Sequence, residues 1–222
     1  MKRNVQLLRL SVVFASLLAA AAANADSVQA CCDIHANGQD RAAAGAPSMS
    51  KVTAPEATFD KTFTLQGITF RVTSANDSSI NTLEIIPSGL ETDNRPISRQ
   101  IDGTVTSAEV ADLNADGSPE IYVYVTSAGS GSYGSLVAYS ANRRKSLSEI
   151  YLPPVAENKA LSKGYMGHDR FAVVESTFVQ RFPIYRDDDT NAAPTGGTRQ
   201  LQYKLVPGEA GWILKLDRVI EY

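Results

Sequence analysis

The sequence predicts an all-β protein, either an antiparallel β-sandwich or an open barrel of about eight or nine strands. Apolar and polar residues alternate with a period of two in short runs bounded by Gly, Pro, Asn or Asp, which is typical of strands. These runs contain Phe63/Leu65, Ile68/Phe70/Val72, Ile121/Val123/Val125, Ala172/Val174, Leu201/Tyr203/Leu205 and Trp212/Leu214/Leu216. Helix-period stretches of useful length are missing, and only residues 106–110 suggest a single helical turn. Antiparallel layers or a barrel are the natural packing for such strands.

The N-terminal region indicates export followed by a tail. A basic start, an apolar run over residues 10–23 and a small-residue cleavage pattern at 23–25 predict a secretory signal peptide over residues 1–25. The apolar run is shorter than the roughly 20 residues that a membrane span needs. The following stretch is rich in Ala, Gly, Pro and Ser without apolar periodicity, so residues 26–58 are expected to be a flexible linker or tail. The folded domain is expected over residues 59–222.

The exported chain is expected to be acidic. Without residues 1–25 it keeps 18 basic and 24 acidic residues, a net charge of −6. Such a charge disfavours nucleic acids and anionic membranes as partners and favours cationic proteins. Cys31 and Cys32 are adjacent and lie in the tail, so they cannot staple the core. A lipid anchor at Cys31 is the less favoured interpretation, because Asp26 and Gln29 fit a lipoprotein processing site poorly.

The segment 112–120 has the spacing of a calcium loop. Its oxygen-bearing side chains stand at positions one, three, five and nine, with a glycine at position six for the sharp bend: Asp112, Asn114, Asp116, Glu120 and Gly117. Position twelve is Val123, which excludes an EF-hand. The alternative is that the same residues form Asx turns that order a strand connection without an ion. No cofactor is required by the sequence, and calcium is the one candidate.

Little in the chain points to catalysis. His168 is the only histidine of the expected domain, and a Ser-His-Asp arrangement would need it beside Asp169 and a serine. The pattern Gly-x-Ser-x-Gly of a nucleophile elbow is absent from the sequence. A lone histidine in a turn more often caps that turn, so a protein that is not an enzyme is favoured over a secreted hydrolase.

A small-residue loop joins two apolar runs at 120–125 and 135–140. It reads Thr126-Ser-Ala-Gly-Ser-Gly-Ser-Tyr-Gly134 and contains a single aromatic residue. Its glycines allow tight turns and a close approach to another surface. Ser130, Ser132 and Tyr133 are then the groups that can reach outward, which predicts a contact loop.

The chain resembles the periplasmic inhibitors of invertebrate-type (I-type) lysozyme, the PliI family. The residues that carry this resemblance are Ser130-Gly131-Ser132-Tyr133, the lead-in at 112–120, Arg-Phe-Pro-Ile-Tyr at 181–185 and Pro-Thr-Gly-Gly-Thr-Arg at 194–199. The family motif Ser-Gly-x-Tyr is matched in full at 130–133. The likeness extends over most of residues 59–222.

The resemblance implies a periplasmic β-sandwich protein with which bacteria blunt the lysozymes of animal hosts or grazers. In that family the Ser-Gly-x-Tyr loop enters the glycan groove of the lysozyme, which makes Ser130 and Tyr133 the expected principal contacts. Arg199 and the turn at 194–197 are a second candidate contact region, unless that turn merely closes a hairpin. The alternative function is a secreted calcium- or carbohydrate-binding β-sandwich module without inhibitor activity.

Overall fold

The computed structural model describes residues 58–222, and within them the chain forms twelve β-strands and one short 3-10 turn, Val155–Glu157. The prediction of an all-β protein is confirmed. No helix in this part of the chain is long and apolar enough to cross a membrane. The predicted signal peptide, nearly all of the predicted tail and the two cysteines lie outside the described residues.

The first sheet is a four-stranded antiparallel meander in the order β1-β2-β3-β4. Its strands are β1 (Phe59–Leu65), β2 (Ile68–Ser74), β3 (Ile80–Ser88) and β4 (Ile97–Asp102). β1 and β2 are joined by Gln66 and Gly67, which both have positive φ, at 51° and 77°. Two such residues suit a tight hairpin whose twist matches that of its strands.

The second sheet has eight strands in the order β5-β6-β7-β8-β12-β11-β10-β9. They are β5 (Thr104–Ala111), β6 (Glu120–Thr126), β7 (Gly134–Asn142), β8 (Ser146–Tyr151), β9 (Arg170–Val174), β10 (Thr177–Pro183), β11 (Thr198–Pro207) and β12 (Trp212–Glu221). All neighbours are antiparallel except β8 and β12, which pair in parallel over two residues.

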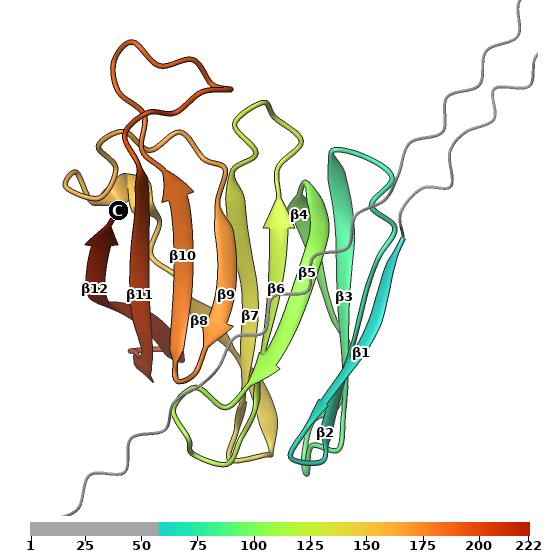
Figure 1. Ribbon diagram of the computed structural model, residues 1–222. Coiled ribbons are helices and arrows are strands. Elements are labelled where there is room, and N and C mark those ends of the chain that lie inside the picture. The colour runs from blue at the N-terminus through green and yellow to red at the C-terminus, as the bar shows by residue number, and fades with distance from the viewer. Residues whose placement is uncertain (1–57) are drawn as a thin grey trace, which may run out of the picture. The chain divides into compact units, whose positions relative to one another are not determined.

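The second sheet curls into a nearly closed barrel (Figure 1). Its edge strands β5 and β9 are joined by a hydrogen bond. The Glu109 carboxylate on β5 accepts hydrogen bonds from the Val173 amide on β9 and from the Tyr124 hydroxyl on β6, each at 2.6 Å. A single oxygen atom of this partly buried carboxylate, Oε2, therefore joins the two edge strands of the sheet.

β6 is buried on both faces, which explains its continuous apolar sequence. Ile121, Val123 and Val125 pack into a core shared with the four-stranded sheet. Tyr122 and Tyr124 point the other way and pack with Phe178 inside the barrel. A strand covered on both sides loses the apolar-polar alternation that marks a half-exposed strand.

The twelve strands between residues 58 and 222 exceed the predicted eight or nine, because several strands lack regular alternation. The suggested helical turn at 106–110 is wrong, since these residues lie in β5. A bulge between Val105 and Ser107 adds a residue to this strand. The buried residues Val105 and Ala108 are thereby spaced by three, as in a helix. β4 is mostly exposed, with Ile101 as its one buried residue, so its sequence carries little apolar pattern.

Candidate functional site

The predicted contact loop is the hairpin connection between β6 and β7. The antiparallel register ends with Thr126 opposite Gly134, which leaves residues 127–133 as the loop. Its ends are tied together, because the Ser127 amide donates to the Tyr133 carbonyl at 2.9 Å and the Tyr133 amide donates to the Ser127 hydroxyl at 3.0 Å. A further bond from the Ser132 amide to the Gly129 carbonyl, 2.9 Å, closes the tip into a turn.

The loop presents a serine and a tyrosine to solvent. Ser130 is exposed, and Tyr133 is 48% exposed. The Tyr133 ring lies edge-on to the Tyr165 ring, with centroids 5.6 Å apart. It also covers Gly131, where an added Cβ would come within 2.5 Å of Tyr133 Cε2. One side of the ring is therefore fixed by the protein while the other is open.

Two other segments hold the loop from outside. The His168 amide, just before β9, donates to the Gly131 carbonyl at 2.8 Å. The Asn191 side-chain amide, in the β10–β11 connection, donates to the Ser130 carbonyl at 2.7 Å. All three segments lie at the same end of the barrel (Figure 1). Sequence reasoning missed Asn191, because an asparagine among Ala and Thr in a loop carries no distinguishing pattern.

Two hollows adjoin this end of the barrel. One, of about 530 Å³, is lined among others by Ser132, His168 and Arg181. The other, of about 870 Å³, is lined among others by Tyr165 and Met166. Met166 is 41% exposed. A partner that bound the loop would therefore contact both apolar and charged residues around it.

His168 and Asp169 are not arranged as two members of a catalytic triad. The His168 Nε2 atom lies 3.2 Å from the Asn191 Oδ1 atom, and its ring stacks on Tyr185. The Asp169 carboxylate instead accepts hydrogen bonds from the Gly134 amide, the Tyr165 hydroxyl and the Gln180 side chain. Burial raises the pKa of Asp169, and these three donors partly offset that effect. The carboxylate thus anchors the first residue of β7, directly after the loop.

Arg199, the second candidate contact, is only 6% exposed. Its Nε atom donates to Glu221 at 2.7 Å, and its Nη1 atom donates to the carbonyls of Leu161 and Lys163 at 2.6 and 2.9 Å. This guanidinium therefore fixes the segment before β9 onto β11 and β12. The turn at 194–197 bonds back to Ile184 and so closes the β10–β11 connection. A direct contact of Arg199 with a partner stays a prediction.

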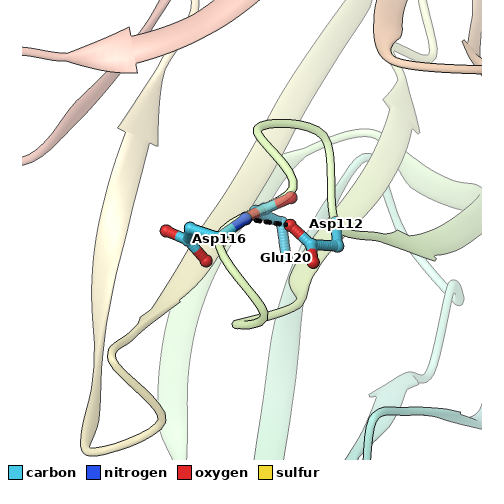
Figure 2. Close-up of side chains that lie close together, drawn as sticks. All are labelled: Asp112, Asp116 and Glu120. Atoms are coloured by element: carbon cyan, nitrogen blue, oxygen red, sulfur yellow. Dashed lines mark hydrogen bonds between the residues drawn. The ribbon is translucent and has the colours of Figure 1, made fainter.

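Of the predicted calcium residues, Asp112, Asn114 and Asp116 lie on the β5–β6 connection and Glu120 is the first residue of β6. Figure 2 shows the three acidic residues. Oxygen atoms of Asp112, Asp116 and Glu120 all lie within 4.8 Å of one another. Glu120 is fully buried. The pKa of Glu120 is raised to about 7, chiefly by burial and in addition by the charges of Asp112 and Asp116. The Leu113 amide, which donates to Glu120 at 2.8 Å, offsets part of this rise. Three carboxylates this close repel one another unless a proton or a cation intervenes.

The same loop also contains the turns of the alternative interpretation. Asp112 accepts a hydrogen bond from the Asp116 amide at 3.0 Å (Figure 2). It accepts another from the Gly117 amide, also at 3.0 Å. The Asn114 side chain bonds to Asp116, both through its amide and through its carbonyl oxygen. Asx turns and clustered carboxylates thus occur together, and calcium binding stays a prediction.

Comparison with known proteins supports one family. The family model described as PliI, periplasmic lysozyme inhibitor of I-type lysozyme, matches residues 92–160. The resemblance to PliI is confirmed. No curated protein and no solved structure matches the chain.

The PliI match covers part of the predicted likeness. It includes the loop 127–133 and the 112–120 segment. It ends before His168, Asn191 and Arg199, so the residues that support the loop from outside lie beyond the matched stretch. The matched family is one of inhibitors and is described as periplasmic.

Proposed function

We propose that this chain is an exported inhibitor of an invertebrate-type lysozyme, whose loop 127–133 blocks the glycan-binding groove of the enzyme. One observation favours this function above the others. The match to an inhibitor family spans a loop whose tip exposes Ser130 and Tyr133. Periplasmic localisation and the signal peptide over residues 1–25 are part of the same proposal.

The chemistry of the loop suits a lysozyme groove, in which two carboxyl groups line a sugar-binding cleft. The Ser130 hydroxyl would donate a hydrogen bond to a catalytic carboxylate, and such a charge-assisted bond is stronger than a neutral one. Tyr133 would fill a saccharide subsite, with its ring in place of a sugar face and its hydroxyl bonded to a polar group. Inhibition would follow from occlusion, so the chain itself would perform no catalysis.

Two further properties favour such an encounter. The loop is tied at its ends and held from outside, which lowers the ordering entropy that binding must overcome. The chain expected after export carries a net charge of −6, and this charge would steer it towards a cationic enzyme.

A cell-wall lysis assay tests the function directly. Lysozymes of the invertebrate, goose and chicken types would each be assayed with and without the chain 26–222. We expect lysis by the invertebrate-type enzyme to slow in proportion to the inhibitor added. Unchanged lysis by invertebrate-type enzymes would refute the proposed function, whatever the other two types do.

The role of the loop is tested by replacing Ser130 and Tyr133 together with alanine. We expect this double variant to lose inhibition while its unfolding midpoint stays close to that of the wild type, because both side chains are exposed. Tyr151→Ala is a matched control, since Tyr151 is 51% exposed and lies on β8 outside the loop. Full inhibition by the double variant would rule out the loop.

A calcium- or carbohydrate-binding module is the second candidate, favoured by the three carboxylates within 4.8 Å. It predicts that a chelator alters stability or glycan binding and that the chain leaves lysozymes untouched. The lysis assay separates the two candidates, because only an inhibitor slows lysis, whereas a calcium-dependent change in stability is compatible with both.

A further inference from the structure

The contacts around the loop point to two residues with a positioning role. We propose that Asn191 and His168 hold the loop 127–133 in the form that enters the lysozyme groove, a role that rests on the proposed function. Neither residue lies in the stretch that matches the family model.

The geometry is a closed ring of hydrogen bonds across three segments. The Asn191 Nδ2 atom donates to the Ser130 carbonyl at 2.7 Å. The Asn191 Oδ1 atom lies 3.2 Å from His168 Nε2, and the His168 main-chain amide returns to the Gly131 carbonyl at 2.8 Å. Asn191 and His168 therefore fix the carbonyl groups of two consecutive loop residues, Ser130 and Gly131.

Asn191 is itself held in place. The Tyr185 hydroxyl donates to the Asn191 carbonyl at 3.0 Å, and the Tyr185 ring stacks on His168 with centroids 6.2 Å apart. The β10–β11 connection, which contains Asn191, is also held by Asp189. The Asp189 carboxylate accepts hydrogen bonds from the amides of Arg186 and Thr195 and from the Thr195 hydroxyl. The support is thus a structured connection rather than a single side chain.

This support matters because the loop contains Gly129 and Gly131, and glycine loses more backbone freedom on ordering than other residues. A loop already held in one form avoids part of that cost on binding. The external bonds use the main-chain carbonyls of Ser130 and Gly131. They leave the Ser130 hydroxyl and the Tyr133 phenol available for a partner.

The test replaces Asn191 with alanine and measures three quantities. We expect the inhibition constant to rise about fivefold, as the loss of one hydrogen bond implies. Amide exchange of residues 129–134 should become faster, and the thermal midpoint should stay unchanged because Asn191 is exposed. Asn191→Asp should behave like alanine, since it lacks the donor to Ser130.

The matched control is Ala192→Ser, a change at the neighbouring exposed position, which should leave all three quantities unchanged. His168→Ala should weaken inhibition, and His168→Gln should restore part of it, because an amide can again bond to Asn191 Oδ1. In the Tyr133→Ala background, Asn191→Ala should cost less than in the wild type, because it acts through the loop.

Each outcome separates this role from the function itself. If Asn191→Ala inhibits like the wild type while the Ser130/Tyr133 double variant does not, the positioning role is wrong and the function stands. If the double variant also inhibits fully, the proposed function fails. Weaker inhibition with unchanged exchange at 129–134 would make Asn191 a direct contact and overturn the positioning role.

Discussion

At the scale of single residues, Tyr133 combines exposure with a fixed position. The residue is 48% exposed, yet its ring lies edge-on to Tyr165 and covers Gly131. An aromatic side chain that is already oriented loses little entropy when a partner covers it. This makes Tyr133 the residue of the loop best suited to carry binding energy.

Truncation of Tyr133 is expected to weaken inhibition strongly. Tyr133→Ala should raise the inhibition constant for an invertebrate-type lysozyme by roughly thirtyfold, the equivalent of about 2 kcal/mol at an interface centre. Tyr133→Phe keeps the ring and should cost less. A titration of lysozyme activity with each variant measures both effects, and an unchanged constant for Tyr133→Ala would remove this residue from the interface.

Gly131 offers a test that leaves every functional side chain in place. A Cβ at this position would lie 2.5 Å from Tyr133 Cε2 and 3.1 Å from the Met166 carbonyl, so the ring would have to move. At Gly129 a Cβ would meet nothing within 4 Å. We therefore expect Gly131→Ala to impair inhibition about tenfold, at an assumed cost of about 1.4 kcal/mol, and Gly129→Ala to have no effect. Equal inhibition constants for the two variants would show that the ring position is unimportant.

At the scale of elements, the β5–β6 and β6–β7 connections lie at opposite ends of β6 (Figure 1). A strand of seven residues separates them by roughly 20 Å, at about 3.3 Å per residue. An ion in the first connection would therefore act on the stability of the fold rather than touch a partner bound to the second.

Calcium is expected to stabilise the protein through the β5–β6 connection. The hard oxygen ligands of Asp112, Asp116 and Glu120 suit this ion, whose charge would offset their mutual repulsion. At a calcium concentration one hundred times the dissociation constant, the free energy of unfolding should rise by about 2.7 kcal/mol. Thermal unfolding in calcium and in chelator measures this shift.

The control for calcium is Asp116→Asn, which keeps a side-chain oxygen for the Ser118 amide while removing one charge. This variant should respond less to calcium than the wild type. Identical unfolding midpoints in calcium and in chelator would contradict calcium binding. The segment 112–120 would then serve only to form the Asx turns of the β5–β6 connection.

The elements that could be predicted from sequence are those whose burial is local and regular. β2 alternates cleanly, with Ile68, Phe70 and Val72 fully buried, and its pattern predicts a strand directly. β5 could not be predicted, because its bulge replaces a period of two with a spacing of three. The exposed serine and tyrosine of the contact loop follow from local composition. The role of Asn191 does not follow from local composition, because it bonds to Ser130, which lies 61 residues away in the sequence.

At the scale of the whole domain, β6 joins two cores within residues 58–222. One face packs with the four-stranded sheet, and the other lines the barrel. The barrel is completed where β9 approaches β5 through Glu109. The loops that form the candidate site emerge from β6, β9 and β10, so their relative positions depend on this closure.

Glu109 is therefore expected to matter for both stability and inhibition. In Glu109→Ala the Tyr124 hydroxyl, on a side chain only 5% exposed, and the Val173 amide lose their shared acceptor. Hydrogen bonds to a charged group contribute about 1.5–3 kcal/mol, so the free energy of unfolding should fall by roughly 3 kcal/mol. Denaturant unfolding measures this loss, and Glu109→Gln, which keeps an acceptor oxygen, should lose less.

A matched glutamate separates closure of the barrel from loss of charge. Glu149 pairs with Arg99 at the surface, and its side chain is 56% exposed, where an ion pair contributes at most about 1 kcal/mol. Glu149→Ala should therefore leave stability nearly unchanged.

The loss of Glu109 should also affect β9 and inhibition, because Glu109 ties β9 to β5. Amide exchange in β9 should become faster and inhibition should weaken, although Glu109 lies in β5 outside the loop. If Glu109→Ala unfolds at the same denaturant concentration as Glu149→Ala, the barrel is held closed by its apolar interior alone.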